Sequence, residues 1–153
     1  MKNPKVWRIA VSISIPLAVG GAAALLSQGF ENFKDLNKPP VSPPAWLFPV
    51  VWSLLYIAMG YASYRVYEYG DRRRSALTVY AVQLAINFVW PLLFFRASNY
   101  FYALICLIVL TVAVLIDAIL FLKNDVPAGY IMLPYIIWCC FALYLNYGVY
   151  ILN

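Results

Sequence analysis

The sequence predicts an all-α integral membrane protein, a single domain over residues 1–153 built as a bundle of five transmembrane helices. Three observations support this fold class. Of the 153 residues, 65% are hydrophobic and only 11% are charged, whereas a soluble domain carries about 25% charged residues. The apolar residues gather in five stretches, each near the roughly 20 residues that a helix needs to cross a hydrocarbon core of about 30 Å. The segments between them leave no room for a soluble domain.

The expected helices follow from the positions of these stretches, at about residues 6–27, 46–69, 76–95, 100–122 and 128–152. The last three gaps are short, so neighbouring helices there run antiparallel. Basic residues before the first stretch also fit a secretory signal. An uncleaved helix is favoured, because its apolar run is longer than a signal core of about 7 to 15 residues.

Residues 28–45 form the one long connection, and they are polar and rich in proline. The pairs Pro39-Pro40 and Pro43-Pro44 cannot continue a helix, since proline lacks a backbone N–H and clashes with the preceding turn. Long loops in compact proteins often act as lids or binding elements, and a plain connector is the alternative.

The basic residues predict an orientation in the membrane. One side collects Lys2, Lys5, Arg8, Arg65, Arg72, Arg73, Arg74 and Lys123, and the other collects Lys34, Lys38 and Arg96. Because cytoplasmic segments are enriched in lysine and arginine, we expect the N-terminus inside and the proline-rich loop outside. The net charge of +5 lies at helix ends rather than in one patch, so nucleic-acid binding is not expected.

The chain contains no histidine. Its three cysteines, Cys106, Cys139 and Cys140, lie within apolar stretches, where a thiol usually behaves as a small hydrophobic group. We therefore expect no metal site and no required cofactor. A phosphate-binding loop, paired catalytic carboxylates and a nucleophile with its base are all missing from the sequence. Conventional hydrolysis or group transfer is accordingly not expected.

The candidate site is an aromatic layer near the outer side of the bundle. Helical spacing places residues of three helices on common faces, most of them at similar depth and Trp138 deeper, near the middle of the membrane. These are Trp52 and Tyr56 on the second helix, Asn87 and Trp90 on the third, and Trp138, Ala142 and Leu145 on the fifth. Such faces either line one cavity or form ordinary packing seams. The amides of Gln83 and Asn87 need partners inside the bundle in both cases.

Asp117 is the one acidic residue well inside a predicted helix. An ionisable group at such a depth is a candidate for function. Arg65 lies at a similar estimated depth on the second helix, so a structural ion pair between Arg65 and Asp117 is the simpler expectation.

Three ordered motifs carry a resemblance over essentially the whole chain. They are NKPPVSPPAWLFPVVWSLLYIAMGYASY over 37–64, QLAINFVWPLLFF over 83–95 and PYIIWCCFALYLNYGVYILN over 134–153. With them the sequence resembles the translocator protein family, also called tryptophan-rich sensory proteins or peripheral-type benzodiazepine receptors, and in particular its bacterial members. The resemblance implies a five-helix bundle in the bacterial cell membrane, commonly a homodimer, with a pocket beneath the first loop.

The resemblance also implies ligands and roles. Family members bind porphyrins, including protoporphyrin IX and haem, and isoquinoline-carboxamide and benzodiazepine ligands. The contacting positions correspond to Trp52, Asn87, Trp90, Trp138, Ala142 and Leu145. Some bacterial members degrade porphyrin in light, which would make Trp52 and Trp138 the catalytic candidates, and whether this chain is an enzyme stays open. The alternatives are a porphyrin or lipid transporter and a ligand-sensing regulatory subunit.

The sequence departs from the family pattern at two places. No basic residue follows Tyr147, so the terminal cholesterol motif of the animal members is incomplete and cholesterol recognition is not expected. Pro49 stands one position earlier than the proline common before the second tryptophan. Because histidine is absent, we expect haem to bind without a strong axial ligand.

Overall fold

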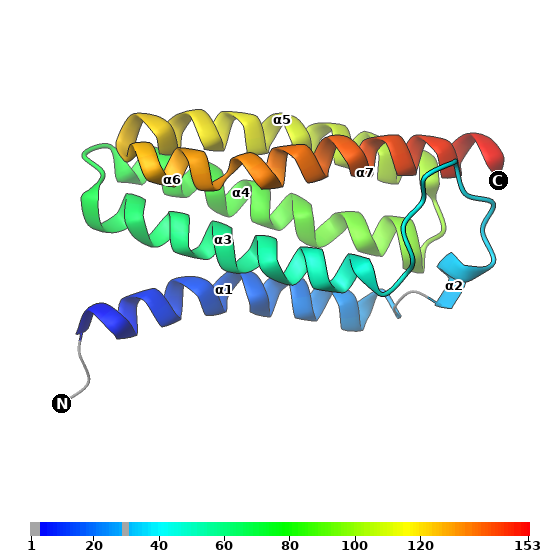
Figure 1. Cartoon of the computed structure of the whole chain (residues 1–153), viewed down its shortest axis with the longest axis horizontal. Helices are drawn as coiled ribbons and strands as arrows, with labels where there is room; N and C mark the ends of the chain where they lie inside the picture. The colour runs from blue at the N-terminus through cyan, green and yellow to red at the C-terminus, as the bar shows by residue number, and fades with distance from the viewer. Residues whose placement is uncertain (1–3, 29–30) are drawn as a thin grey trace.

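The computed structural model describes residues 4–28 and 31–153, and within them it contains helices and no strands (Figure 1). Lys2, used above for the orientation, and residues 29 and 30 of the expected loop lie outside the described residues. The elements are α1 (Pro4–Leu26), α2 (Glu31–Lys34), α3 (Leu47–Tyr69), α4 (Arg73–Pro91), the π-helix η1 (Leu92–Arg96), α5 (Tyr100–Asn124), α6 (Val126–Ile131) and α7 (Leu133–Leu152).

Five helical units of the described chain are long and apolar enough to cross a membrane. They are α1, α3, α4 with η1, α5, and α6 with α7. The predicted all-α class with five membrane-crossing helices is therefore confirmed. The units lie side by side (Figure 1), with α1 against α3 and α4, α5 against α4 and α7, and α6 against α3. We call the end that carries α2 and the C-terminus the loop end, and the opposite end, where α1 begins, the N-terminal end.

The surface of α5 shows why these helices suit a lipid environment. Its exposed side chains are apolar and recur every three or four residues, at Ile105, Ile108, Val109, Val112, Leu115, Ile116 and Ile119. Its buried face carries Ala103, Leu107, Leu110 and Val114, which are 0% exposed. A helix that is apolar all round belongs in a protein core or a membrane. Packing and hydrogen bonds, rather than apolar burial, then hold the helices together.

The structure interrupts two of the expected helices near prolines. The fifth expected helix is divided at Met132 into α6 and α7, and Pro134 in the first turn of α7 supplies no backbone N–H. Pro91 is followed by the π-helix η1, where the Ala97 N–H donates to the Leu92 carbonyl five residues earlier. π-Helical turns insert an extra residue into a helix and are frequent at functional sites.

The expected ion pair between Arg65 and Asp117 is wrong. Arg65 instead pairs with Asp125, whose Oδ2 lies 2.6 Å from Nε and whose Oδ1 lies 3.1 Å from Nη2. Asp125 also caps α6, since Oδ2 accepts a hydrogen bond from the Ala128 N–H at 3.0 Å. The long arginine side chain reaches the polar end of the bundle, where both charges stay partly hydrated. Asp117 remains in the interior with no hydrogen-bond partner among the described residues.

Residues 37–40 are fastened to α7. The Asn37 N–H donates to Asn153 Oδ1 at 3.0 Å, and Asn153 Nδ2 donates to the Asn37 carbonyl at 2.9 Å. The Tyr144 hydroxyl donates to the Pro40 carbonyl at 2.6 Å. Pro39 packs directly over Gly148, where a Cβ would overlap the proline ring. The loop thus follows the end of α7 closely because glycine leaves room for it.

Asp125 variants separate the ion pair from the helix cap. We expect Asp125→Asn, which keeps a capping oxygen, to lower the free energy of unfolding by about 1–3 kcal/mol, because the Arg65 guanidinium loses its counter-charge. Asp125→Ala removes the cap as well and should cost about 1 kcal/mol more. Unfolding of the purified protein in mixed micelles measures both values, and equal stability of wild type and Asp125→Asn would contradict the assignment.

The same pair predicts an acid transition. The hydrogen bond from Arg65 holds the pKa of the Asp125 carboxyl below its ordinary value. The stabilisation is therefore fully present above the unfolded-chain pKa of about 3.9 and is lost as the pH falls through the lower folded-state value. The stability difference between wild type and Asp125→Asn should shrink over that acidic range.

Candidate ligand-binding site

A cavity of about 170 Å³ lies toward the loop end of the bundle, between α1, α3 and α4. Its wall combines small residues of α1 with aromatic and polar residues of α3 and α4. The lining residues are Leu17, Gly20, Gly21, Ala24, Ser27, Phe48, Pro49, Trp52, Ser53, Tyr56, Asn87, Trp90, Pro91 and Phe95. The structure thus brings four sequence-predicted site residues together around one space: Trp52, Tyr56, Asn87 and Trp90.

Trp52 is at the centre of the aromatic wall. Its ring stacks on Tyr56 of the next turn, with the centroids 5.7 Å apart. It also lies 6.1 Å from the Trp90 ring on α4 and 6.1 Å from the Tyr135 ring on α7. Aromatic pairs in these arrangements stabilise one another by about 0.5–1.5 kcal/mol beyond their buried area. The indole of Trp52 is therefore held by neighbours on three helices while one part of it faces the cavity.

A chain of hydrogen bonds leads from the cavity wall into the bundle. The Tyr56 hydroxyl donates to Asn87 Oδ1 at 2.6 Å, and Asn87 Nδ2 donates to the Tyr135 hydroxyl at 2.7 Å. The Tyr135 hydroxyl in turn donates to Gln83 Oε1 at 3.0 Å. These four side chains are at most 7% exposed. The partners that the sequence requires for the Asn87 amide are thus tyrosines on α3 and α7.

Trp90 is positioned in a similar way. Its indole Nε1 donates to Asn146 Oδ1 on α7 at 3.0 Å, and Asn146 Nδ2 donates to the Tyr100 carbonyl at the start of α5. The ring also lies 5.4 Å from Phe94. Asn146 and Tyr135 do not line the cavity, yet they determine the orientation of two residues that do.

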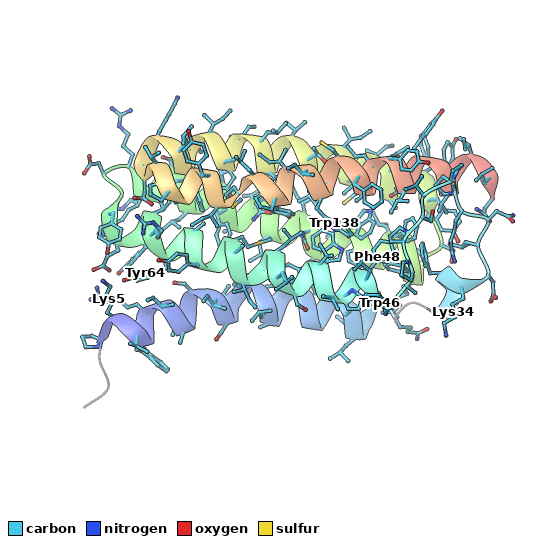
Figure 2. The ribbon with its side chains drawn as sticks, viewed as in Figure 1. Lys5, Lys34, Trp46, Phe48, Tyr64 and Trp138 are labelled. Carbon is cyan, nitrogen blue, oxygen red and sulfur yellow. The ribbon has the colours of Figure 1, made fainter. Side chains whose placement is uncertain are left out.

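The predicted site residues of the fifth helix lie one layer behind the cavity. Ala142 and Leu145 are 5% exposed and belong to the packed core. Trp138 is half-buried, and its ring lies 6.0 Å from Phe48, which does line the cavity. Figure 2 shows these two side chains close together near the middle of the bundle. The Trp138 Nε1 is buried and has no hydrogen-bond partner among the described residues.

Phe33 of α2 packs against two aromatic residues of the cavity wall, Phe48 and Phe95. Its side chain is 4% exposed and lies 5.2 Å from the Phe48 ring and 6.2 Å from the Phe95 ring. The Lys38 ammonium lies 4.5 Å above the Phe33 ring. Lys34 follows Phe33 and is exposed at the same end of the bundle (Figure 2). A ligand that reached past Phe33 would therefore meet positive charge at the rim.

The wall contributed by α1 is absent from the sequence-based candidates. Gly20 is buried against Tyr56, and a Cβ at this position would overlap the tyrosine ring. Gly21 has open space where its Cβ would be. The sequence did contain a signal, since the run Gly20–Ala24 consists of small residues. Small residues at helical spacing fit close helix packing as well as a cavity wall, and the share of α1 in the cavity depends on the rotation of that helix.

The geometry favours binding over conventional catalysis. A pocket for a drug-sized ligand measures about 300–1,000 Å³, so a cavity of about 170 Å³ accepts one edge of a large flat molecule unless Phe33 or Phe48 moves. Among the described residues no three His, Cys, Asp or Glu side chains form a group that could hold a metal ion. The cavity offers indole and phenol faces and one amide, while the segment after Phe33 carries Lys34 and Lys38 with Asp35 between them.

Comparison with known proteins agrees with these features. The model of the TspO/MBR family matches residues 12–152. The translocator protein of Bos taurus is 35% identical over 151 residues, which covers 94% of this chain and 89% of the relative. The tryptophan-rich protein TspO of Chlorobaculum tepidum is 31% identical over 99% of both chains. Protein CrtK of Rhodobacter capsulatus is 36% identical over 88% of this chain and 85% of its own.

The matched region includes the second half of α1, the other four membrane-crossing helices, the proline-rich loop and the cavity. Both bacterial and animal relatives are covered over most of their length. The chain is an integral membrane protein that belongs to the TspO/MBR family.

Proposed function

We propose that the chain binds tetrapyrroles, with protoporphyrin IX and haem as the test ligands, in the cavity between α1, α3 and α4. The observation that carries the proposal is the aromatic wall of the cavity. The indole rings of Trp52 and Trp90 lie 6.1 Å apart beside the space. A flat macrocycle gains dispersion and stacking energy from such walls. Other flat apolar ligands, including isoquinoline carboxamides, meet the same surface.

The rim suits the carboxylates of a porphyrin. Lys34 follows Phe33 directly in the sequence, and Lys38 comes four residues later. Displacement of Phe33 would open the cavity toward these two ammonium groups, so the propionates lie at the polar end while the ring lies between the aromatic side chains. The iron of haem finds no histidine, and its binding therefore relies on the ring rather than on an axial bond.

The distribution of charge supports an orientation in the bacterial cell membrane. The described residues at the N-terminal end of the bundle include Lys5, Arg8, Arg72, Arg73, Arg74 and Lys123, whereas the loop end carries Lys34, Lys38 and Arg96. Since basic residues favour the cytoplasmic side, the N-terminal end lies inside and the cavity opens toward the outside.

Light-dependent degradation of the bound porphyrin is the reaction that this site suits. Excitation of the macrocycle beside Trp52 allows one electron to pass from the indole to the ring, which leaves an indole radical cation and a porphyrin radical anion. The ring radical adds dissolved dioxygen through a new C–O bond, and the adduct returns one electron to the indole. The net change is addition of one O₂ to the macrocycle, whose conjugation is lost, and Trp52 is restored. Trp52 forms part of the cavity wall, while Trp138 is separated from the cavity by the Phe48 ring. Trp52 therefore contributes more to the light-dependent reaction than Trp138 does.

Tryptophan variants test both binding and turnover. Trp52→Phe removes stacking area and should weaken protoporphyrin IX binding by about threefold to tenfold. It should also slow the aerobic, light-dependent loss of porphyrin absorbance more than Trp138→Phe does. Fluorescence titration measures the first effect, and absorbance spectra in light and in darkness, with and without oxygen, measure the second.

Trp46→Phe is the matched control, because Trp46 is 65% exposed and does not line the cavity. It should bind and degrade porphyrin as the wild type does. Equal losses in the Trp46 and Trp52 variants would contradict the assignment of the cavity. Binding without any light-dependent loss would leave a receptor and remove the proposed reaction.

Two neighbouring glycines test the shape of the cavity. Gly20→Ala forces the Tyr56 ring aside and breaks its hydrogen bond to Asn87, so we expect a stability loss of about 1–3 kcal/mol and an affinity for protoporphyrin IX that is lower by about tenfold. Gly21 also lines the cavity, but a methyl group there meets no other atom within 4 Å. Gly21→Ala therefore leaves the hydrogen bond between Tyr56 and Asn87 intact, so it should keep the wild-type stability and lower the affinity less than Gly20→Ala does.

Both variants replace glycine by alanine within α1 and therefore gain the same helix propensity. Titration of each purified variant with protoporphyrin IX gives the comparison. If Gly20→Ala bound as tightly as Gly21→Ala, the position of Tyr56 would not matter for the ligand, and the cavity between α1 and α3 would not be the binding site.

A further inference from the structure

Asp117 is a second candidate site, remote from the cavity mouth. It lies on α5, seven residues before the helix ends at Asn124, which corresponds to a depth of about 10 Å. The residue is 0% exposed, and neither carboxylate oxygen has a hydrogen-bond partner among the described residues. An isolated carboxylate is costly to bury in an apolar interior, by far more than a neutral polar group.

No basic side chain forms an ion pair with Asp117 within residues 4–28 and 31–153. Arg65, the basic residue of α3 nearest in depth, makes two hydrogen bonds to Asp125. Lys123 lies on α5 itself but is exposed at the end of the helix. The buried titratable side chains on helices packed against α5 are Tyr56, Tyr64, Tyr80, Tyr135 and Cys139. None of these carries a positive charge.

Polar groups with unused hydrogen-bonding capacity gather near Asp117. The Tyr80 hydroxyl on α4 is close enough to interact electrostatically with Asp117, and Ser63 of α3 lies beside that hydroxyl. Tyr80 is 7% exposed, and apart from its contact with Ser63 its hydroxyl has no hydrogen-bond partner in the described structure. Gln83 lies one turn further along α4, and its Nε2 is also buried without a partner there. The two acceptor oxygens of Asp117 thus lie near one hydroxyl, and an unused amide donor lies one turn from that hydroxyl on α4.

We propose that Asp117 is a proton-binding site inside the membrane, where Tyr80 and Gln83 complete a small hydrated cluster, and that its occupancy is coupled to the ligand cavity. Protonation removes the charge that burial disfavours and gives Asp117 a donor of its own. A buried water typically makes about three hydrogen bonds to polar groups that otherwise lack partners. The Asp117 carboxyl, the Tyr80 hydroxyl and the Gln83 amide would give one water molecule three such partners.

Gln83 connects the cluster to the cavity. Its Oε1 accepts the hydrogen bond from Tyr135, which ends the chain that begins at Tyr56 on the cavity wall. Its Nε2 is buried and has no hydrogen-bond partner among the described residues. Loss of the proton from Asp117 creates a strong acceptor for donors nearby. The Gln83 amide then shifts toward the cluster and weakens its contact with Tyr135.

The coupling is reciprocal by thermodynamic necessity. A ligand that requires the Tyr56 and Asn87 side chains in their present positions binds best when Asp117 is protonated, and its binding favours retention of the proton. This coupling rests on the proposed porphyrin binding, whereas the proton site does not. The proton site and its coupling to the cavity therefore need separate measurements.

Infrared spectroscopy of the ligand-free protein tests the proton site directly. In an ester-free detergent at neutral pH, the wild type should show the C=O stretching band of a protonated carboxyl, shifted in D₂O. Asp117→Asn should lack this band, and Asp71→Asn, the same change at an exposed turn, should retain it. Tyr80→Phe should shift the frequency of the Asp117 band, because the neighbouring hydroxyl is lost. Absence of the band in the wild type, or its persistence in Asp117→Asn, would overturn the proposal without reliance on a variant's activity.

Binding of protoporphyrin IX as a function of pH tests the coupling. The ratio of wild-type to Asp117→Asn affinity at each pH cancels the titration of the porphyrin itself. This ratio should fall by about fivefold or more from mildly acidic to alkaline pH, since only the wild type can lose the proton. A constant ratio would refute the coupling. Failure of both proteins to bind porphyrin would refute the proposed function, while the infrared band would still decide the proton site.

Discussion

The interior of a membrane protein offers little water to its polar side chains, so each buried amide and hydroxyl needs a partner on another helix. The chain from Tyr56 through Asn87 and Tyr135 to Gln83 meets this requirement across α3, α4 and α7. Interhelical hydrogen bonds in membranes contribute about 0.6 kcal/mol each on average, so their main effect here is directional. They determine how α3 and α4 are rotated, and with that rotation the faces that carry Trp52 and Trp90.

The cavity depends on this rotation as much as on its own residues. With α3 and α4 held by their hydrogen bonds, α1 completes the wall with small side chains, and Phe33 and Phe48 fill the space that remains toward the loop. The described state is thus nearly closed. Its volume of about 170 Å³ suits a few water molecules, and a large planar ligand gains its contacts by replacing phenylalanine rings with its own ring.

Much of this architecture could be predicted from the sequence. The helices follow from apolar length, and the spacing of Trp52, Tyr56, Asn87 and Trp90 placed them on faces that do meet at one cavity. Depth along a helix could not identify the partner of Arg65, because a flexible side chain reaches Asp125 beyond the helix end. The role of α1 was also inaccessible, since a run of glycine and alanine fits either close packing or a cavity wall. Trp138 shows a further limit, because helical spacing gives the face on which a side chain lies but not whether another ring, here Phe48, stands between it and the cavity.

The fastening of the loop affects how the protein can be handled. The oxygen and the nitrogen of the Asn153 side-chain amide both hydrogen-bond to the Asn37 backbone. Tyr144 hydrogen-bonds to the Pro40 carbonyl, and Pro39 packs over Gly148. A fusion partner or purification tag attached after Asn153 would sit against this junction and compete for the same amide. Ligand exchange measured on such a fusion would then report the attachment as well as the native loop, so reporters are better placed at the opposite terminus.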